Sequence, residues 1–63
     1  MKNPWIVGTS MRVRRNGLTC EVWPIYCDGI LVAECPAFVA DEREMVANNA
    51  RLIVEAVNAW GIG

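Results

Sequence analysis

A single amphipathic helix is the feature that most constrains how this chain folds. Residues 41–61, which read DEREMVANNARLIVEAVNAWG, carry apolar side chains at intervals of three and four positions. This spacing gathers them on one side of a helix with 3.6 residues per turn. The stripe consists of Met45, Val46, Leu52, Ile53, Ala56, Val57 and Trp60. We expect a helix from about Glu42 to Trp60, packed onto the rest of the chain through this stripe, with Leu52 and Ile53 at its buried centre.

Both ends of this helix carry recognisable signals. Asp41 is a good N-cap residue, and Glu44 follows three positions later, where its carboxylate can reach back to the free amide of the cap. Gly61 is expected to end the helix, because the residue after the last turn often adopts positive φ. The two signals enclose about five helical turns.

Two dipeptides predict tight hairpin turns upstream of the helix. Asn16-Gly17 and Asp28-Gly29 each separate two stretches of extended character. A type I′ turn needs positive φ at both central residues, and these residue pairs adopt it most readily. We therefore expect positive φ at both glycines.

Three strands are expected around these turns. Residues 11–15 alternate apolar and arginine side chains, residues 18–27 form a return strand interrupted by Pro24, and residues 30–35 are almost entirely apolar. Pro24 predicts an edge position, a bulge or a free amide side, and residues 1–10 are expected to be a lead-in strand or an arm. The predicted fold is α+β: a three-stranded antiparallel meander packed on one C-terminal amphipathic helix, as a single domain over residues 1–63.

The chain is more apolar than one helix and a small sheet can hide. Hydrophobic residues make up 54% of its 63 residues, and a chain of this length buries only about 60% of the surface that its unfolded form exposes. One helix covers one sheet face, so we expect the other face to stay uncovered, with Trp23 on it and Trp5 and Tyr26 on or beside it. Large apolar patches mark partner surfaces. The sequence thus predicts a homo-oligomer or a protein target.

Charge disfavours nucleic acid as the main partner. Six Lys and Arg against seven Asp and Glu give a formal net charge of -1, so no overall positive field attracts phosphate groups. Arg12, Arg14 and Arg15 nevertheless follow one strand, where arginines can reach phosphates or guanine edges. A DNA-binding module that uses the arginine-bearing sheet face is therefore the alternative function. The second alternative is an oligomer that sequesters a small nucleotide between its subunits, through the same arginines and backbone amides near the turns.

The sequence predicts no membrane partner. No apolar run approaches the roughly 20 residues that span a bilayer. Residues 1–11 lack the apolar stretch of about 7–15 residues that a signal peptide carries. We expect a cytoplasmic protein.

No group of residues indicates catalysis or a cofactor. The chain contains no histidine, the usual base beside a nucleophilic cysteine. Cys20, Cys27 and Cys35 lie seven and eight positions apart and lack the fourth ligand that structural zinc requires. We expect these cysteines to be small buried hydrophobic residues. The sequence predicts no enzyme, no metal and no cofactor.

The segment VANNARLIVEAVNAW resembles the C-terminal helix of a group of small phage and prophage accessory proteins. In that group a strand pair ending in an Asp-Gly turn leads to a helix that reads roughly A-N-A-R-L-I-A. The matching residues here are 49–53, with Asp28-Gly29 upstream and Glu42 and Glu44 shortly before them. After Ile53 the chain departs from the group, because Val-Glu-Ala-Val replaces a small-residue and proline stretch. The resemblance implies a phage accessory gene product and assigns no activity.

The function expected from these observations is protein binding. We predict a small phage-type accessory protein that docks on a host or phage protein, in the form of an inhibitor of a host defence or regulatory protein. Tryptophan, tyrosine and arginine are enriched at interface hot spots. The predicted partner-binding residues are Trp5, Arg12, Arg14, Trp23 and Tyr26.

Overall fold

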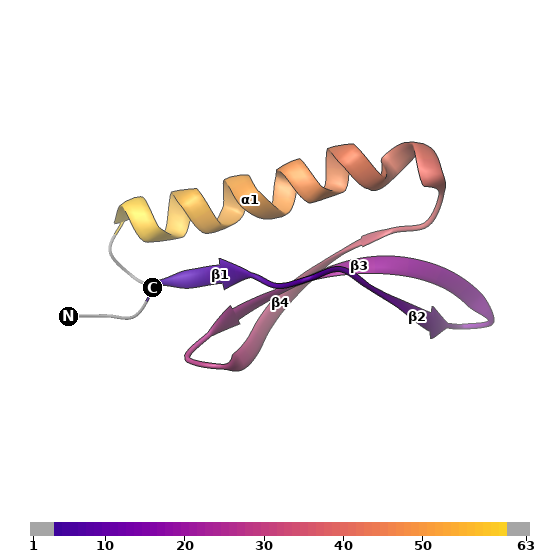
Figure 1. Cartoon of the computed structure of the whole chain (residues 1–63), viewed down its shortest axis with the longest axis horizontal. Coiled ribbons are helices and arrows are strands. Elements are labelled where there is room, and N and C mark those ends of the chain that lie inside the picture. Colours follow the sequence, from indigo (N-terminus) through magenta and orange to yellow (C-terminus); the bar gives the residue numbers. More distant parts are fainter. Residues whose placement is uncertain (1–3, 61–63) are drawn as a thin grey trace.

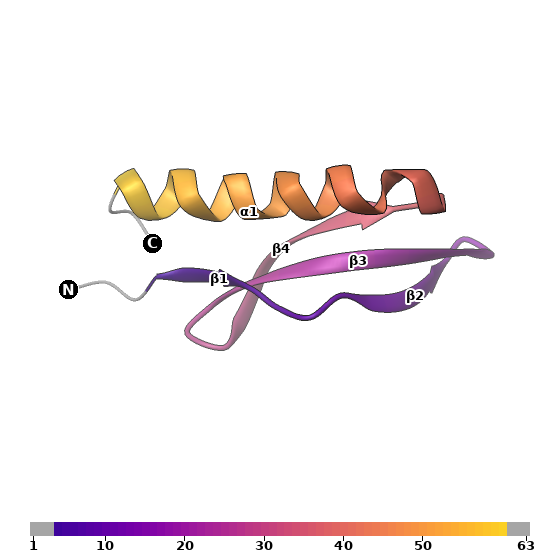
Figure 2. The same cartoon turned by 45° about the horizontal axis from the view of Figure 1, so that its top comes forward.

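The chain folds into a four-stranded antiparallel sheet with one helix lying along one of its faces (Figure 1). The structure is a computed structural model, and it describes residues 4–60. In chain order the elements are β1 (Trp5–Val7), β2 (Met11–Arg15), β3 (Leu18–Cys27), β4 (Ile30–Ala37), the short 3-10 helix η1 (Ala40–Glu42) and α1 (Arg43–Trp60). The predicted α+β class is confirmed, with four strands in place of three. The helix runs over the length of the sheet (Figure 2).

β3 is the central strand of this sheet. Its residues 21–27 pair with β4, its residues 18–22 with β2 and its residues 25–27 with β1. Because the segment paired with β4 overlaps both of the others, β1 and β2 must share the opposite edge of β3. The residues before β2 therefore include a lead-in strand, which was one of the two forms predicted for them.

Residues 8–10 interrupt the edge formed by β1 and β2. β1 leaves β3 opposite Ile25 and β2 joins it opposite Val22, so this edge has one residue more than β3 over the same interval. An extra residue in one strand of an antiparallel pair is a β-bulge. Pro24 lies opposite the interruption, and its carbonyl accepts a hydrogen bond of 2.8 Å from the Gly8 amide. A central strand tolerates proline at such a bulge, so the bulge predicted for Pro24 is the form observed.

The helix covers the sheet face that carries Glu21 and Trp23. Glu21 accepts hydrogen bonds from Arg43 of α1, and Trp23 lines a hollow together with Arg43 and Ala47. Successive strand residues point to opposite faces, so Cys20 and Val22 point away from the helix. The prediction that Trp23 lies on the uncovered face is therefore wrong.

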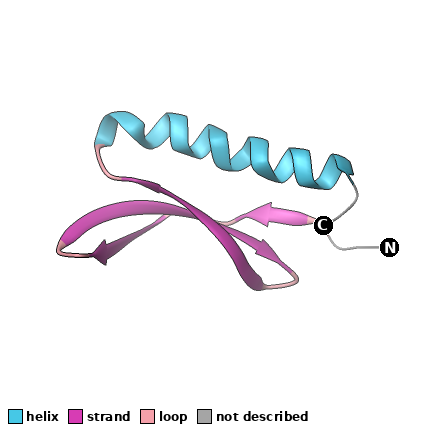
Figure 3. Ribbon diagram, turned by 180° about the vertical axis from the view of Figure 1, so that it is seen from behind, coloured by secondary structure: helices cyan, strands magenta, loops and turns pink. Residues whose placement is uncertain are grey.

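The face away from the helix is concave. Val32 of β4 is left out of the pairing with β3, and this second bulge adds to the bend of the sheet. Arg15 and Glu34 form an ion pair on this face, although they stand beside Leu18 and Pro24 of β3. In a straight strand those two positions would be about 20 Å apart, so the ion pair requires curvature, which Figure 3 shows in β3. Curvature buries apolar side chains that the helix does not touch.

The core is small and draws on both sheet faces and on the helix. Within residues 4–60 its buried apolar members are Cys20, Val22, Ile25, Ala37, Val46 and Ala50, together with Pro24. More large apolar side chains remain exposed than are buried. The interior therefore leaves much of the apolar content of the chain on the surface.

Both hairpin turns have the predicted conformation. Gly17 has a φ of 79° and Gly29 a φ of 77°, and the preceding residues Asn16 and Asp28 also have positive φ, 52° and 56°. Positive φ at both central residues defines the type I′ turn, whose twist matches that of the paired strands. The two-hairpin prediction is confirmed.

The helix begins slightly differently from the prediction. The cap is Val39, and the carboxylate that reaches back belongs to Glu42, whose Oε1 accepts hydrogen bonds from the amides of Phe38 at 3.0 Å and Val39 at 3.4 Å. Asp41 and Glu44 were predicted for these two roles. A short 3-10 turn precedes α1 and shifts the cap towards the N-terminus. The predicted stop at Gly61 lies outside the described residues.

The helix is rotated about its axis relative to the prediction. Val46 and Ala50 are buried against the sheet and Val57 is half-buried, whereas Leu52 and Ile53 are exposed. The predicted inner stripe is thus correct for Val46 and Val57, and it is wrong for Met45, Leu52, Ile53, Ala56 and Trp60. Small and β-branched side chains let the helix approach the curved sheet closely, and longer side chains would hold it away.

Polar contacts at both ends of α1 fix this rotation. Near its start, Arg43 donates to Glu21 of β3, with Nε to Oε1 at 2.5 Å and Nη2 to Oε2 at 3.3 Å. Near its end, the Asn58 side chain holds the backbone of Trp5 in β1 through two hydrogen bonds, Trp5 N to Oδ1 at 2.9 Å and Nδ2 to Trp5 O at 3.0 Å. Both anchors lie on the same side of the helix as Ala50, so this side faces the sheet.

Candidate functional site

α1 carries a second line of mostly apolar side chains that stays on the surface. We call it the outer stripe, and its members are Met45, Asn49, Leu52, Ile53, Ala56 and Trp60. All six are exposed. They recur every three to four positions, so they form one continuous line on a helix. The outer stripe spans about 22 Å of helix at 1.5 Å per residue.

The exposure of this line is large for apolar side chains. The exposed fractions are 55% for Met45, 60% for Leu52, 42% for Ile53 and 77% for Trp60. Single exposed apolar residues are ordinary, whereas a contiguous line of them marks an interaction surface. A helix that presents apolar anchors at this spacing is suited to pack against another helix or into a groove.

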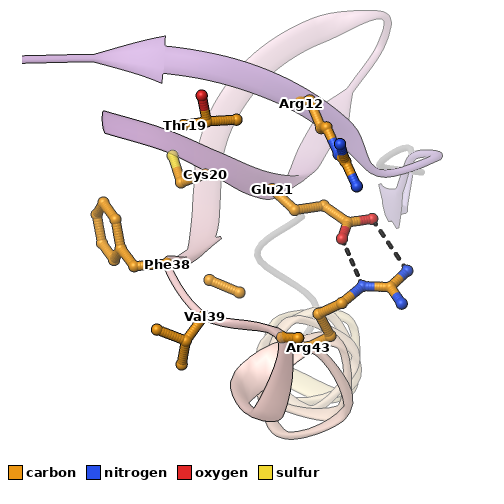
Figure 4. Close-up of a pocket in the computed structure, with 9 residues that line it drawn as sticks. Arg12, Thr19, Cys20, Glu21, Phe38, Val39 and Arg43 are labelled. Carbon is orange, nitrogen blue, oxygen red and sulfur yellow. Dashed lines mark hydrogen bonds and ion pairs between the residues drawn. The ribbon is translucent and has the colours of Figure 1, made fainter. Parts of the chain in front are cut away.

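A charged cluster lies between β2, β3 and the start of α1. Its centre is Glu21, whose side chain is 16% exposed. In addition to the contacts with Arg43, Glu21 Oε2 accepts a hydrogen bond of 2.6 Å from the Ser10 hydroxyl. Arg12 lies on the far side of the same carboxylate (Figure 4).

These contacts stabilise the charged form of Glu21. Hydrogen bonds from Arg43 and then from Ser10 lower the pKa of the Glu21 carboxyl below its usual range, and burial opposes them more weakly. The hydrogen bond to Glu21 likewise raises the pKa of Arg43. Glu21 is therefore an ionised structural anchor for the helix, and its environment does not prepare it to take up a proton near neutral pH.

A shallow open pocket adjoins this cluster. Its lining residues are Arg12, Thr19, Cys20, Glu21, Ala37, Phe38, Val39, Ala40 and Arg43. Phe38 and Val39 stand on one side of it and the two guanidinium groups on the other (Figure 4). Glu21 accepts hydrogen bonds from Arg43, and the charge of Arg12 also helps to lower the pKa of Glu21, so both cations of this lining face the same carboxylate. The pocket offers no nucleophile with an adjacent base.

The three arginines of β2 do not form one surface. Arg12 and Arg14 pair with Glu21 and Thr19, so they share the sheet face on which the helix lies. Arg15 points to the concave face and is held by Glu34, whose hydrogen bond raises the pKa of Arg15. The structure therefore separates residues that the sequence placed together as a candidate DNA contact.

The three predicted aromatic anchors are also separated. Trp5 and Trp23 are half-buried on the helix side of the sheet, Trp5 beside Asn58 and Trp23 beneath the first turns of α1. Tyr26 lies on the concave face against Gly8. The prediction that one uncovered sheet face unites these three residues is wrong. Contact of Trp5, Arg12, Arg14, Trp23 or Tyr26 with a partner stays a prediction.

The cysteines do not form a metal site among residues 4–60. No group of three or more Cys, Asp or Glu side chains within that range is placed to hold a metal ion. All three thiols are free; Cys20 is buried, and Cys27 and Cys35 are half-buried. The prediction of small, packed cysteines is thus fulfilled completely by Cys20 and in part by the other two.

Two further observations bear on the function. Over residues 4–60, α1 is too polar to serve as a membrane-spanning segment. The chain matches no protein-family model, no curated protein and no solved structure. The resemblance to phage accessory proteins therefore rests on the residues quoted for it.

The outer stripe was visible in the sequence as part of a broader apolar pattern. Apolar residues of the helix cover two neighbouring stripes, one centred near Ala50 and one near Leu52 and Ile53. The two stripes differ in the size of their side chains, because the first is made of alanine and valine and the second carries leucine, methionine and tryptophan. The prediction placed the largest side chains in the core, so it buried the stripe that is in fact exposed.

Proposed function

We propose that this protein acts by binding another protein surface through the outer stripe of α1. The observation that supports the proposal is the continuous exposure of Met45, Leu52, Ile53 and Trp60 on a helix that is already anchored to its own sheet. Such a helix needs little ordering when it binds, so it loses little conformational entropy at the interface.

The biological setting that we propose follows the sequence resemblance. A small phage accessory protein without catalytic residues would act in the host cytoplasm by occupying a surface of a host or phage protein. Inhibition of a host defence or regulatory protein is the specific form of this proposal. A tryptophan beside aliphatic anchors is the composition expected of an interface hot spot.

The described geometry favours protein binding over the DNA-binding alternative. A sheet reader of DNA needs its cations on the face that the helix leaves free. On that face Arg15 is neutralised by Glu34, while Arg12 and Arg14 lie on the helix side. The nucleotide-sequestering alternative loses Arg15 in the same way, because its guanidinium is paired with Glu34.

A matched pair of charge substitutions tests the proposed function. Leu52→Glu places a carboxylate in the outer stripe, and Arg51→Glu places the same group at an exposed position on the other side of the same helix. Wild type and both variants are immobilised and exposed to a soluble extract of the host cell, and each purified protein is also examined by light scattering. We expect every association shown by the wild type, with itself or with another protein, to be lost in Leu52→Glu and kept in Arg51→Glu. Associations that survive in both variants would contradict the proposal.

A further inference from the structure

We propose that the outer stripe binds a second copy of this chain, as an antiparallel helix pair with its two-fold axis beside Leu52 and Ile53. This inference rests on the proposed function and adds the identity and the orientation of the partner. An isologous interface must be self-complementary, because each copy presents the same patch to the other. The spacing of the outer stripe satisfies this condition.

The outer stripe reads the same in both directions along the helix. The steps between its six members are four, three, one, three and four residues. In an antiparallel pair centred between Leu52 and Ile53, Met45 therefore meets Trp60 of the second copy and Asn49 meets Ala56 of the second copy. At the axis, Leu52 meets Ile53 of the second copy.

The chemistry of these pairs is favourable. A methionine thioether packs well against an aromatic ring, which suits Met45 beside Trp60. Asn49 is the polar member of the stripe, and opposite a small alanine its amide has room to keep a water molecule or a backbone partner. The stripe thus brings no charged side chain to the centre of the pair.

Charge decides between the antiparallel and the parallel arrangement. The first turns of the helix carry Asp41, Glu42 and Glu44, with no basic residue in the last turn of the described helix. A parallel pair would place two acidic starts and two like dipole ends side by side. An antiparallel pair separates the acidic starts by the length of the helix and opposes the two dipoles.

The size and shape of the single chain also favour a second copy. Its accessible surface is 4590 Å², whereas a compact monomer of 7.0 kDa has about 4,000 Å². Its radius of gyration is 12.4 Å, against roughly 10.6 Å for a compact domain of this length. A standard interface covers about 800 Å² per partner, and Trp60 supplies on the order of 150–250 Å². One side of an elongated molecule is long enough to provide the remainder.

The sheet edge is a weaker candidate for the same role. β4 is the outer strand, and it exposes Ile30 and Leu31. It also carries Pro36 and the bulge at Val32, two devices that obstruct the addition of a further strand. The outer stripe has no comparable obstruction among the described residues.

Disulfide trapping tests both the partner and the orientation. Asn49→Cys and Ala56→Cys are made separately and mixed under mild oxidation, and light scattering measures the mass of the wild type. In the proposed pair positions 49 and 56 face each other, whereas two copies of position 49 lie about 10 Å apart along the axis, beyond the Cα separation of about 7 Å that a disulfide allows. We expect a linked dimer in the mixture and none from either variant alone.

Peptide mapping separates this product from reactions of the native cysteines. Cleavage after Arg43 and Arg51 places position 49 in the fragment 44–51 and position 56 in the fragment 52–63, apart from Cys20, Cys27 and Cys35. The expected product joins these two fragments. Leu52→Glu should also raise the dissociation constant of the dimer by about thirtyfold or more, the effect of losing one hot spot, and Arg51→Glu should not.

Three results would overturn this inference. They are a monomeric wild type, a homodisulfide formed by Asn49→Cys alone, and a dimer that forms no 49-to-56 link. If the wild type is monomeric while capture of another protein depends on Leu52, the second copy is wrong and the proposed function stands. If no association depends on Leu52, both fail.

Discussion

Glu21 and Gly8 both contact neighbouring elements, but they stabilise the fold in different ways. Glu21 joins the helix to the sheet through charge, because it accepts hydrogen bonds from Arg43 and Ser10. Gly8 permits close approach, because an ideal Cβ there would lie 2.7 Å from Tyr26 Cε2 and 3.2 Å from Pro24 Cγ. The first effect should depend on pH and the second should not.

The contribution of Glu21 should disappear in acid. Since its pKa is lowered in the folded protein, its stabilising effect is fully present above the pKa of the unfolded chain and is lost as the pH falls through the folded value. Wild type should melt at a higher temperature than Glu21→Gln at neutral pH, and the difference should shrink below about pH 4. Thermal unfolding across this range checks the prediction, with Glu55→Gln on the exposed helix surface as control. A difference that stays constant into strong acid would contradict it.

Gly8→Ala should destabilise the fold by about 1–3 kcal/mol, the usual cost of adding a methyl group where no space exists. The hydrogen bond from Gly8 to Pro24 holds the backbone in place, so the Tyr26 ring must move. Urea unfolding of Gly8→Ala, Tyr26→Ala and the double variant measures the coupling. The alanine at position 8 should cost much less when Tyr26 is already truncated. Additive costs would show that the ring is not the obstacle.

At the scale of the element, substitutions on α1 can test which side of the helix faces the sheet. Ala50 is 0% exposed and lies between the two polar anchors. Ala50→Leu should therefore cost about 1–3 kcal/mol through overpacking. Ala59→Leu, on the exposed surface of the same helix, should change stability by no more than about 0.5 kcal/mol. Denaturant unfolding monitored by circular dichroism gives both values. Equal costs at the two positions would mean that the helix is rotated differently from this description.

At the scale of the whole molecule, the two tryptophans at positions 23 and 60 should have opposite roles. Trp23 is half-buried beneath α1, so Trp23→Ala should lower stability by more than about 1 kcal/mol, though less than the roughly 3–5 kcal/mol of a fully buried tryptophan. Trp60 is mostly exposed, so Trp60→Ala should keep the fold and weaken association. This reverses the roles that sequence reasoning assigns to the two residues.

Light scattering and thermal unfolding of the same two variants distinguish these roles. Loss of association together with an unchanged unfolding of the diluted monomer is expected for Trp60→Ala. If Trp23→Ala folds normally and fails to associate, the sheet side would be the interface and the outer stripe would not.

The sequence by itself determined the features that depend on neighbouring residues. The Asn-Gly and Asp-Gly turns, the alternation of β2 and β3 and the extent of the helix all follow from backbone preferences and from side-chain periods within a few positions. These preferences act between neighbouring residues, so they do not depend on how the rest of the chain packs. The separate strand β1 was less visible, because three residues carry little pattern.

Only the tertiary structure decided which sides of these elements meet. Periodicity shows that the helix is apolar over two adjacent stripes, but it does not show which stripe is buried. The contacts that decide this join residues far apart in the chain, Arg43 with Glu21 and Asn58 with Trp5. The curvature caused by the bulges likewise buries Cys20 and Val22 without a helix over them. The candidate site is the stripe that these long-range contacts turn away from the sheet, because a helix bonded to strands at both ends cannot rotate to bury its larger side chains.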